Sequence, residues 1–190
     1  MPFLSEKVLP IIEENEATGE VAELYETIKR EMQVPFVPNI LKGLGASPAA
    51  LQIQWGMMQA FYGFTTLPQS LIAMISFTIA EKSDCTYCTA NHELTCRTLG
   101  VDENTLKLLV EDLSNVRPER IQAIIEFALK AAKHPKDLVA ADYDRLREQG
   151  VTDEEIIEIV LVAAVGVYSD TLADALKIEV EPSVVQALGR

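Results

Sequence analysis

The sequence of 190 residues has few basic residues and few aromatic residues. Lysine and arginine number 16 against 29 aspartates and glutamates, which gives a formal net charge of −13. Nucleic acids and anionic membranes require concentrated positive charge, so we expect neither as a partner. Aromatic residues make up 6% of the chain although hydrophobic residues make up 48%, a composition that favours tightly packed helices.

Targeting and membrane-spanning signals are also lacking. Residues 1–10 have no basic segment followed by an apolar one, so we predict no secretory signal and a cytoplasmic location. The longest apolar runs, Leu71–Ala80 and Ile159–Tyr168, are far shorter than the roughly 20 residues that span a bilayer. In a reducing compartment, clustered cysteines indicate catalysis or metal binding rather than a structural disulfide framework.

What the sequence does contain is one short reactive segment, residues 81–97, with all three cysteines and one of the two histidines. Five of its side chains fall within an arc of about 80° when the segment is drawn as a helix: Glu81, Cys85, Cys88, His92 and Cys96. We therefore take this face as the candidate site.

Cys85 and Cys88 form a C-x-x-C pair. Residues three apart on a helix have β-carbons about 5–6 Å apart, so the pair can cycle between dithiol and disulfide. Ser83 and Asp84 are good N-cap residues, which would place the cysteines in a first helical turn where the macrodipole favours thiolate. His92 lies one turn beyond Cys88 and can accept its proton or stabilise its thiolate. We predict Cys88 as the nucleophile and Cys85 as its resolving partner.

Glu81, the run Cys85-Thr86-Tyr87-Cys88 and His92 together resemble the C-x-x-C-x-x-x-H signature of alkylhydroperoxidase D-like (AhpD-like) proteins. These proteins belong to the carboxymuconolactone decarboxylase superfamily, and the resemblance is nearest to its peroxidase-related branch. It is sharpest over residues 71–100 and looser over residues 39–181. The resemblance implies that Cys88 attacks a peroxide, that Cys85 resolves the product, and that a glutamate joins His92 in a proton relay. The family's glutamate lies about three turns before the first cysteine, where this sequence has Ala73, so Glu81 is the nearest candidate.

Metal binding is the main alternative use of these residues. Cys85, Cys88, His92 and Cys96 have the composition of a structural zinc site. A continuous helix would separate Cys85 from Cys96 by about 16 Å, so binding by all four requires a broken helix. Covalent haem requires histidine directly after the second cysteine, where Thr89 stands. We interpret Cys96 as a small buried hydrophobic residue.

The remaining pattern predicts a single all-α domain, with residues 1–38 as an N-terminal arm and helix and residues 39–190 as the AhpD-like helical domain. The arm, to about residue 17, should lie over the body or a neighbouring subunit. Helices are expected at about 19–32, 48–62, 66–81, 84–99, 102–113, 118–134, 138–149 and 153–176, with a turn at 39–44.

Three features of these helices carry further expectations. The helix at 153–176 should be buried nearly all round. We interpret a stripe of large side chains as core rather than as a pocket lining: Trp55, Met57, Met58 and Phe61. His134 should be a solvated helix end. Residues 160–177 share the apolar pattern of residues 72–88, which suggests an internal duplication that aligns Ser169-Asp170 with Asp84-Cys85.

The leading hypothesis is a thiol-dependent peroxidase that reduces hydrogen peroxide or organic hydroperoxides and is regenerated by an external dithiol or thioredoxin-like reductant. The cycle requires no cofactor and no metal. The alternatives are a dithiol–disulfide carrier or redox sensor, a zinc-stabilised structural protein and, least favoured, a decarboxylase. The family resemblance and the wide apolar surfaces of residues 71–80 and 156–167 predict a homo-oligomer, a trimer or a hexamer.

Overall fold

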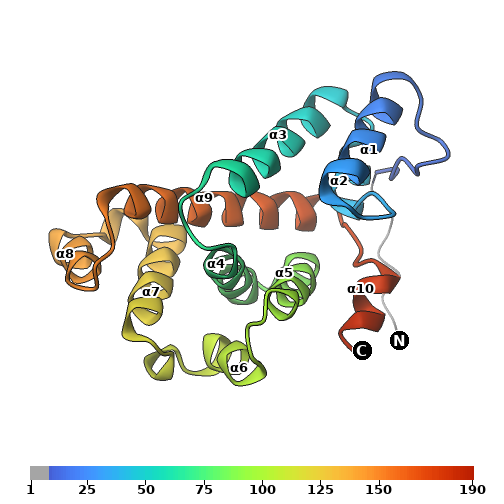
Figure 1. The fold of residues 1–190 in the computed structure, drawn as a ribbon. Helices are drawn as coiled ribbons and strands as arrows, with labels where there is room; N and C mark the ends of the chain where they lie inside the picture. Colours follow the sequence, from blue (N-terminus) through green and yellow to red (C-terminus); the bar gives the residue numbers. More distant parts are fainter. Residues whose placement is uncertain (1–8) are drawn as a thin grey trace.

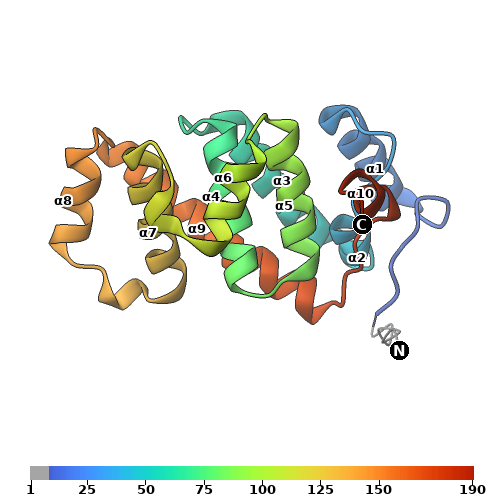
Figure 2. The ribbon, with the colours of Figure 1, turned by 90° about the horizontal axis from the view of Figure 1, so that it is seen from below.

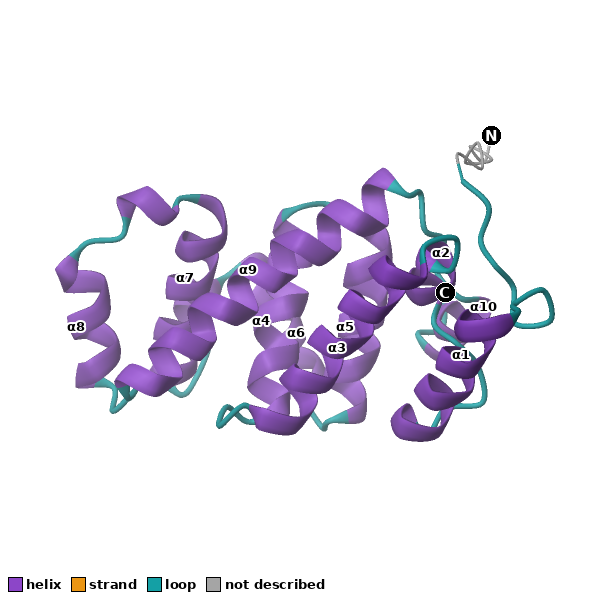
Figure 3. Ribbon diagram, turned by 90° about the horizontal axis from the view of Figure 1, so that it is seen from above, coloured by secondary structure: helices purple, strands orange, loops and turns teal. Residues whose placement is uncertain are grey.

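The structure is a computed structural model that describes residues 9–190, apart from the side chains of Tyr62 and Phe64. Within that range the chain consists of α-helices, two 3-10 helices and loops, with no strand (Figure 3). The α-helices are α1 (Gly19–Met32), α2 (Asn39–Leu44), α3 (Pro48–Phe64), α4 (Gln69–Lys82), α5 (Thr86–Thr98), α6 (Glu103–Glu111), α7 (Glu119–Lys133), α8 (Ala140–Glu148), α9 (Asp153–Ala175) and α10 (Pro182–Ala187). The predicted all-α class is confirmed.

Local capping residues set several of the helix starts. Ser47 and Asp102 accept hydrogen bonds from the backbone amides of Ala50 and Thr105, at 3.3 and 2.9 Å. At the start of α9, Thr152 and Glu155 form a capping box, in which each side chain accepts a hydrogen bond from the other's amide.

Two short helices were not expected. Residues 39–44 were expected to be a turn but form α2, and α10 lies beyond the last predicted helix. Each has six residues, too few for a helix to be stable alone. The Glu181 carboxylate, just before α10, accepts a hydrogen bond of 2.6 Å from the Asn39 amide at the start of α2. This contact joins segments that are 142 positions apart in sequence, which local patterns do not reveal.

α9 forms the long axis of the molecule, and α4 packs across it (Figure 1). At the crossing, Gly166 of α9 lies so close to Ile79 that an added β-carbon would be 3.3 Å from the isoleucine Cγ2. The Glu158 carboxylate of α9 also accepts hydrogen bonds from the amides of Thr66 and Leu67 ahead of α4. These contacts fix α4 against α9.

The helix that leads to the cysteines is buried on all sides within one chain. Nine of the 14 residues of α4 are buried, and α5, α6, α7 and α9 pack around it. Viewed from below, α4, α5 and α6 lie next to one another (Figure 2), and α4 and α5 pack against α9. The wide apolar surface of residues 71–80 is therefore satisfied without a second subunit.

The expectation that α9 is buried nearly all round is wrong. A stripe at helical spacing is exposed on it: Ile157, Val160, Leu161 and Val167. Among the described residues α9 is the one helix whose length and hydropathy meet the criteria for a bilayer span. It also packs against α4, α5, α7 and α8, and its first turn carries three acidic residues. This is the environment of a core helix that keeps one apolar face uncovered.

The described part of the N-terminal arm lies on its own chain. The Ile12 amide donates to the Lys42 carbonyl at 3.1 Å, and the Tyr25 hydroxyl donates to the Ile12 carbonyl at 3.0 Å. Glu14 accepts a hydrogen bond from the Val37 amide at 2.9 Å. The rest of the predicted arm, residues 1–8, lies outside the described residues.

Candidate active site

A tight turn between α4 and α5 presents the two cysteines. The amides of Ser83 and Cys85 both donate to the Ala80 carbonyl, at 3.2 and 3.1 Å, and Asp84 adopts a left-handed conformation with φ of 58°. Aspartate is one of the few residues other than glycine that tolerates this conformation. Cys85 is the N-cap of α5, in place of the predicted Ser83 or Asp84, and Cys88 lies in the first turn.

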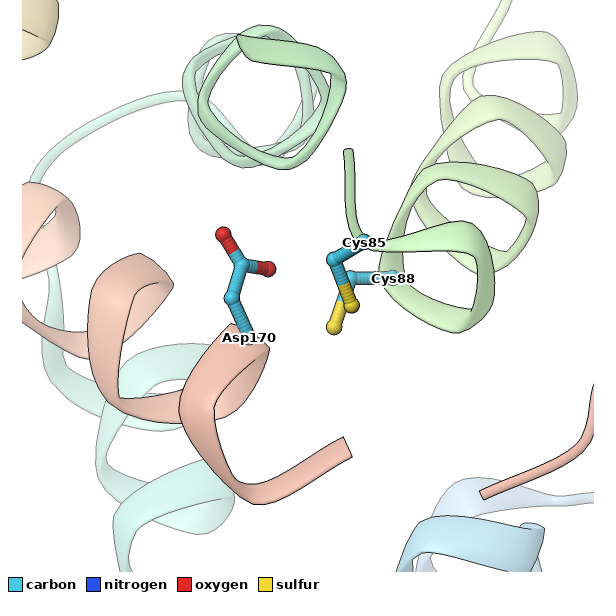
Figure 4. Close-up of side chains that lie close together, drawn as sticks. All are labelled: Cys85, Cys88 and Asp170. Atoms are coloured by element: carbon cyan, nitrogen blue, oxygen red, sulfur yellow. The ribbon is translucent and has the colours of Figure 1, made fainter. Parts of the chain in front are cut away.

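The two thiols meet a carboxylate from α9. The sulfur atoms of Cys85 and Cys88 and an oxygen of Asp170 all lie within 4.8 Å of one another. The three residues are 0%, 4% and 6% exposed. Asp170 projects toward the start of α5, where the two sulfurs lie next to each other (Figure 4). One of its oxygens, Oδ2, is buried and has no hydrogen-bond partner among the described residues.

The electrostatics of this cluster differ from the sequence expectation. The pKa of Cys88 is raised, mainly by its hydrogen bond with Cys85, then by burial and by the charge of Asp170. Burial also raises the pKa of Asp170, an effect that contacts with Cys88, Ser83 and Cys85 partly offset. The helix macrodipole was expected to favour thiolate at Cys88. The hydrogen bond with Cys85, burial and the charge of Asp170 outweigh it, so the Cys88 thiol stays protonated in the resting state.

His92 lies on α5 and lines the same cavity as Cys88. Burial lowers its pKa to about 4, so the imidazole is neutral at physiological pH. Glu81, at the end of α4, lies outside both the sulfur–carboxylate cluster and the cavity lining. Within residues 9–190, no hydrogen bond joins His92 to Cys88 or to Glu81. The predicted relay through Glu81 and His92 therefore stays a prediction, and the acid that the fold brings to the cysteines is Asp170.

A cavity of about 200 Å³ opens beside Cys88. Its wall is mostly apolar and is formed by Met57, Met58, Phe61, Ile72, Val162 and Val165. The α3 stripe was interpreted as core, and Trp55 is 6% exposed in the core. Met57, Met58 and Phe61 line the cavity, although Met58 and Phe61 also pack against the core. Periodicity alone could not separate these cases, because core and pocket side chains share one helix face.

Gln54 is one of several polar residues in the cavity wall, and among the described lining residues it alone has a buried side-chain atom without a hydrogen-bond partner. It is 5% exposed, and its Oε1 atom has no hydrogen-bond partner among the described residues. A buried polar atom without a partner is costly, of the order of 1–3 kcal/mol. A ligand that donates a hydrogen bond would satisfy this atom.

A second network holds the start of α5 in place. The Tyr87 hydroxyl donates to Glu181 at 3.1 Å and accepts from the Ile40 amide at 3.2 Å. Tyr87 lies directly before Cys88, so this network ties the cysteine segment to α2 and to the C-terminal segment. Burial is the first cause of the strongly raised pKa of Tyr87, which keeps its hydroxyl protonated as a donor. No sequence pattern indicated Glu181.

The four-ligand zinc site is not formed. α5 is continuous from Thr86 to Thr98, and Cys96 is fully buried in the separate core around α4, α7 and α9, as expected of a small hydrophobic residue. Neither Cys96 nor His92 belongs to the cluster that contains Cys85 and Cys88. His134 is exposed at the C-cap of α7, as expected of a helix end.

No protein-family model matches the sequence, and no curated protein matches it significantly. Solved structures do share its fold. A peroxidase-related protein from Silicibacter sp. TM1040 has a TM-score of 0.81 at 22% identity, with 93% of this chain and 92% of that one covered. An uncharacterized peroxidase-related protein with an alkylhydroperoxidase AhpD core, from Ralstonia eutropha JMP134, has a TM-score of 0.82 at 21% identity, with 93% of both chains covered.

The debrominase Bmp8 has a TM-score of 0.79 at 18% identity, with 97% of both chains covered. A cysteine-to-alanine variant of the same debrominase, solved with 2,3,4-tribromopyrrole, has a TM-score of 0.77 at 17% identity and covers 97% of this chain and 98% of that one. The predicted AhpD-like, peroxidase-related fold is thus confirmed. At these identities the likeness concerns the fold, and proteins with this fold differ in activity.

Proposed function

We propose that the protein is a thiol-dependent oxidoreductase that reduces small organic hydroperoxides through a Cys85–Cys88 dithiol–disulfide cycle. The observation that carries the proposal is the pairing of the two buried thiols with Asp170, next to a mostly apolar cavity that Cys88 lines. The fold shared with peroxidase-related proteins supports the same reaction class.

In the first step, Asp170 accepts the Cys88 proton, and the thiolate attacks the outer oxygen of the hydroperoxide. A sulfur–oxygen bond forms, the oxygen–oxygen bond breaks, and the leaving alkoxide takes up the proton to give an alcohol. The raised pKa of Asp170 makes it a better base than an ordinary aspartate. His92, neutral and facing the cavity, can donate a hydrogen bond to the leaving oxygen.

In the second step, the Cys85 thiol condenses with the Cys88 sulfenic acid, giving a disulfide and one water molecule. An external dithiol, such as a thioredoxin-like protein, then reduces the disulfide by thiol exchange. Because Cys85 is fully buried, Cys88 at the cavity wall is the sulfur that this reductant would attack.

The cavity favours an organic hydroperoxide over hydrogen peroxide. When the apolar wall covers an alkyl or aryl group, water is excluded and binding becomes more favourable by about 25 cal/mol for each Å² of apolar surface covered. Hydrogen peroxide has no such group. The hydroperoxide O–H can donate to Gln54 Oε1, the one buried acceptor of the wall that has no partner among the described residues.

The test is turnover of cumene hydroperoxide and hydrogen peroxide with a dithiol reductant, followed by disulfide mapping. Cys88→Ser should abolish turnover, whereas Cys85→Ser should accumulate a Cys88 sulfenate that a dimedone probe traps. Cys96→Ser is the matched control, because Cys96 lies in a different core and should be dispensable for turnover. Equal activity of the Cys85 and Cys88 variants with wild type would refute the proposal. Equal reduction of small disulfides and no reduction of either peroxide would indicate a dithiol carrier instead.

Reductive dehalogenation of a small halogenated aromatic compound is a second candidate. The cavity beside Cys88 and the fold shared with Bmp8 favour it. In this reaction the two thiols supply two electrons, and a carbon–hydrogen bond replaces the carbon–halogen bond. The products are the dehalogenated compound, a disulfide and a hydrogen halide. Halide release from 2,3,4-tribromopyrrole with a dithiol reductant tests it. Release that persists in Cys88→Ser would exclude the cysteine pair as its source.

A further inference from the structure

We propose that Cys85, Cys88 and Asp170 form a binding site for one thiophilic divalent cation, zinc above all, that exists only while the cysteines are reduced. The site differs from the Cys₃His arrangement considered from sequence, because the third protein ligand comes from α9. It does not depend on peroxidase activity.

The spacing of the donors suits one small ion. Zinc binds sulfur at about 2.3 Å and carboxylate oxygen at about 2.0–2.2 Å in a tetrahedron, so two ligand sulfurs lie about 3.8 Å apart. The three donor atoms here already lie within 4.8 Å of one another. Small side-chain movements would bring them to one ion. Three protein ligands leave a fourth position for water or another small ligand, which the cavity beside Cys88 can admit.

An independent observation is the unsatisfied carboxylate. Asp170 is 6% exposed, and its Oδ2 atom has no hydrogen-bond partner among the described residues. The strongest influences on Asp170 and Cys88 come from thiols, the Ser83 hydroxyl, the Asp174 carboxylate and burial, and none of them is a cation. Buried anions are normally paired or coordinate a metal. A divalent cation would satisfy Oδ2 and stabilise both thiolates at once.

Oxidation must empty the site. When two thiolates become a disulfide they lose two electrons to the oxidant, and both sulfur ligands are removed. With diamide, the azo nitrogen–nitrogen double bond accepts these electrons and two protons, giving the hydrazine. The remaining carboxylate is too weak a ligand to hold the ion, so the redox state of the pair controls metal binding.

The experiment titrates the reduced full-length chain, freed of metal, with cobalt(II) and then displaces the cobalt with zinc. We expect one equivalent of cobalt to bind with thiolate-to-cobalt charge-transfer absorption, and X-ray absorption of the zinc form to report two sulfur donors with oxygen donors. Diamide should abolish the charge-transfer band. Substoichiometric binding, a band that survives oxidation, or a shell with three sulfurs would overturn the proposal.

Two variants test the contribution of α9. Asp170→Asn removes the carboxylate at nearly constant volume and should weaken zinc binding by at least about tenfold in competition with a chromophoric chelator. Asp174→Asn is the matched control: it lies one turn away on the same helix, is exposed, and should bind zinc like wild type. Unchanged affinity in Asp170→Asn would refute the assignment of the ligand. Because no arm uses peroxide, failure of the peroxidase proposal would leave these outcomes unaffected.

Discussion

Replacing Asp170 by asparagine should lower the pKa of Cys88 but also decrease peroxide turnover. The carboxylate lies within 4.8 Å of both sulfurs, and all three residues are buried. A unit charge at that distance in an effective dielectric of about 20 disfavours the thiolate by about 3.5 kcal/mol. Asparagine has nearly the same shape and no charge. The pKa of Cys88 should therefore fall, while the base proposed for its deprotonation is lost.

The assay is the pH dependence of iodoacetamide alkylation, with the modified cysteine identified by peptide mass spectrometry. The midpoint for Cys88 should shift to lower pH in Asp170→Asn, whereas peroxide turnover at neutral pH should decrease. Asp174→Asn provides the control. The exposed Asp174 carboxylate contributes to the raised pKa of Asp170, but it does not belong to the cluster of Cys85, Cys88 and Asp170. An alkylation midpoint that stays the same or rises in Asp170→Asn would refute the electrostatic reasoning.

Three other predictions concern stability and assembly. Burial lowers the pKa of His92 from 6.5 to about 4, so the folded state resists protonation of this imidazole. As pH falls from 6.5 to 4, the wild-type protein should therefore lose up to about 3 kcal/mol of unfolding free energy relative to His92→Gln. Urea unfolding at each pH measures this difference. Glu181→Gln should lower the free energy of unfolding by about 1–3 kcal/mol, because it weakens the hydrogen bonds to the Asn39 amide and the Tyr87 hydroxyl. Glu154→Gln, at an exposed position, should leave the free energy of unfolding almost unchanged. Light scattering of the wild-type protein should give the mass of a trimer or a hexamer. Leu161→Glu, on the exposed α9 stripe, should dissociate this oligomer. A wild-type mass near 21.0 kDa would exclude the oligomer.

The long helices could be predicted from sequence because their signals are local. Apolar spacing with caps such as Ser47 and Thr152, and stops such as Gly100 and Gly150, placed most boundaries within about two residues. α2 and α10 escaped prediction because contacts between distant segments hold them: Glu181 stabilises the first turn of α2, and α10 packs against α5. Short helices depend on tertiary contacts of this kind more than on their own composition.

The site was predictable where its residues share one helix and not where they meet across helices. Cys85, Cys88 and His92 follow from spacing on α5, whereas Asp170 reaches the sulfurs only because α9 packs against α4 and α5. The suggested duplication aligned Ser169-Asp170 with Asp84-Cys85, and this was the one sequence signal that pointed to the residue that meets the sulfurs. Glu81, the acid proposed from its position upstream of the cysteines, lies outside the sulfur–carboxylate cluster, and its role in a relay stays a prediction.

The position of Asp170 on α9 connects the site to the exposed apolar stripe that we predict as an assembly surface. α9 carries Asp170 and Gly166 on its inner face and the uncovered stripe of Ile157, Val160, Leu161 and Val167 on its outer face. A helix held by packing on both faces has less freedom to shift than one held on a single face. Close approach of Gly166 to Ile79 leaves no room for α9 to move inward. A contact on the outer stripe would therefore fix the distance from the Asp170 carboxylate to the two sulfurs. Both proposals depend on this distance, because it governs proton transfer to Asp170 and the joint binding of a cation.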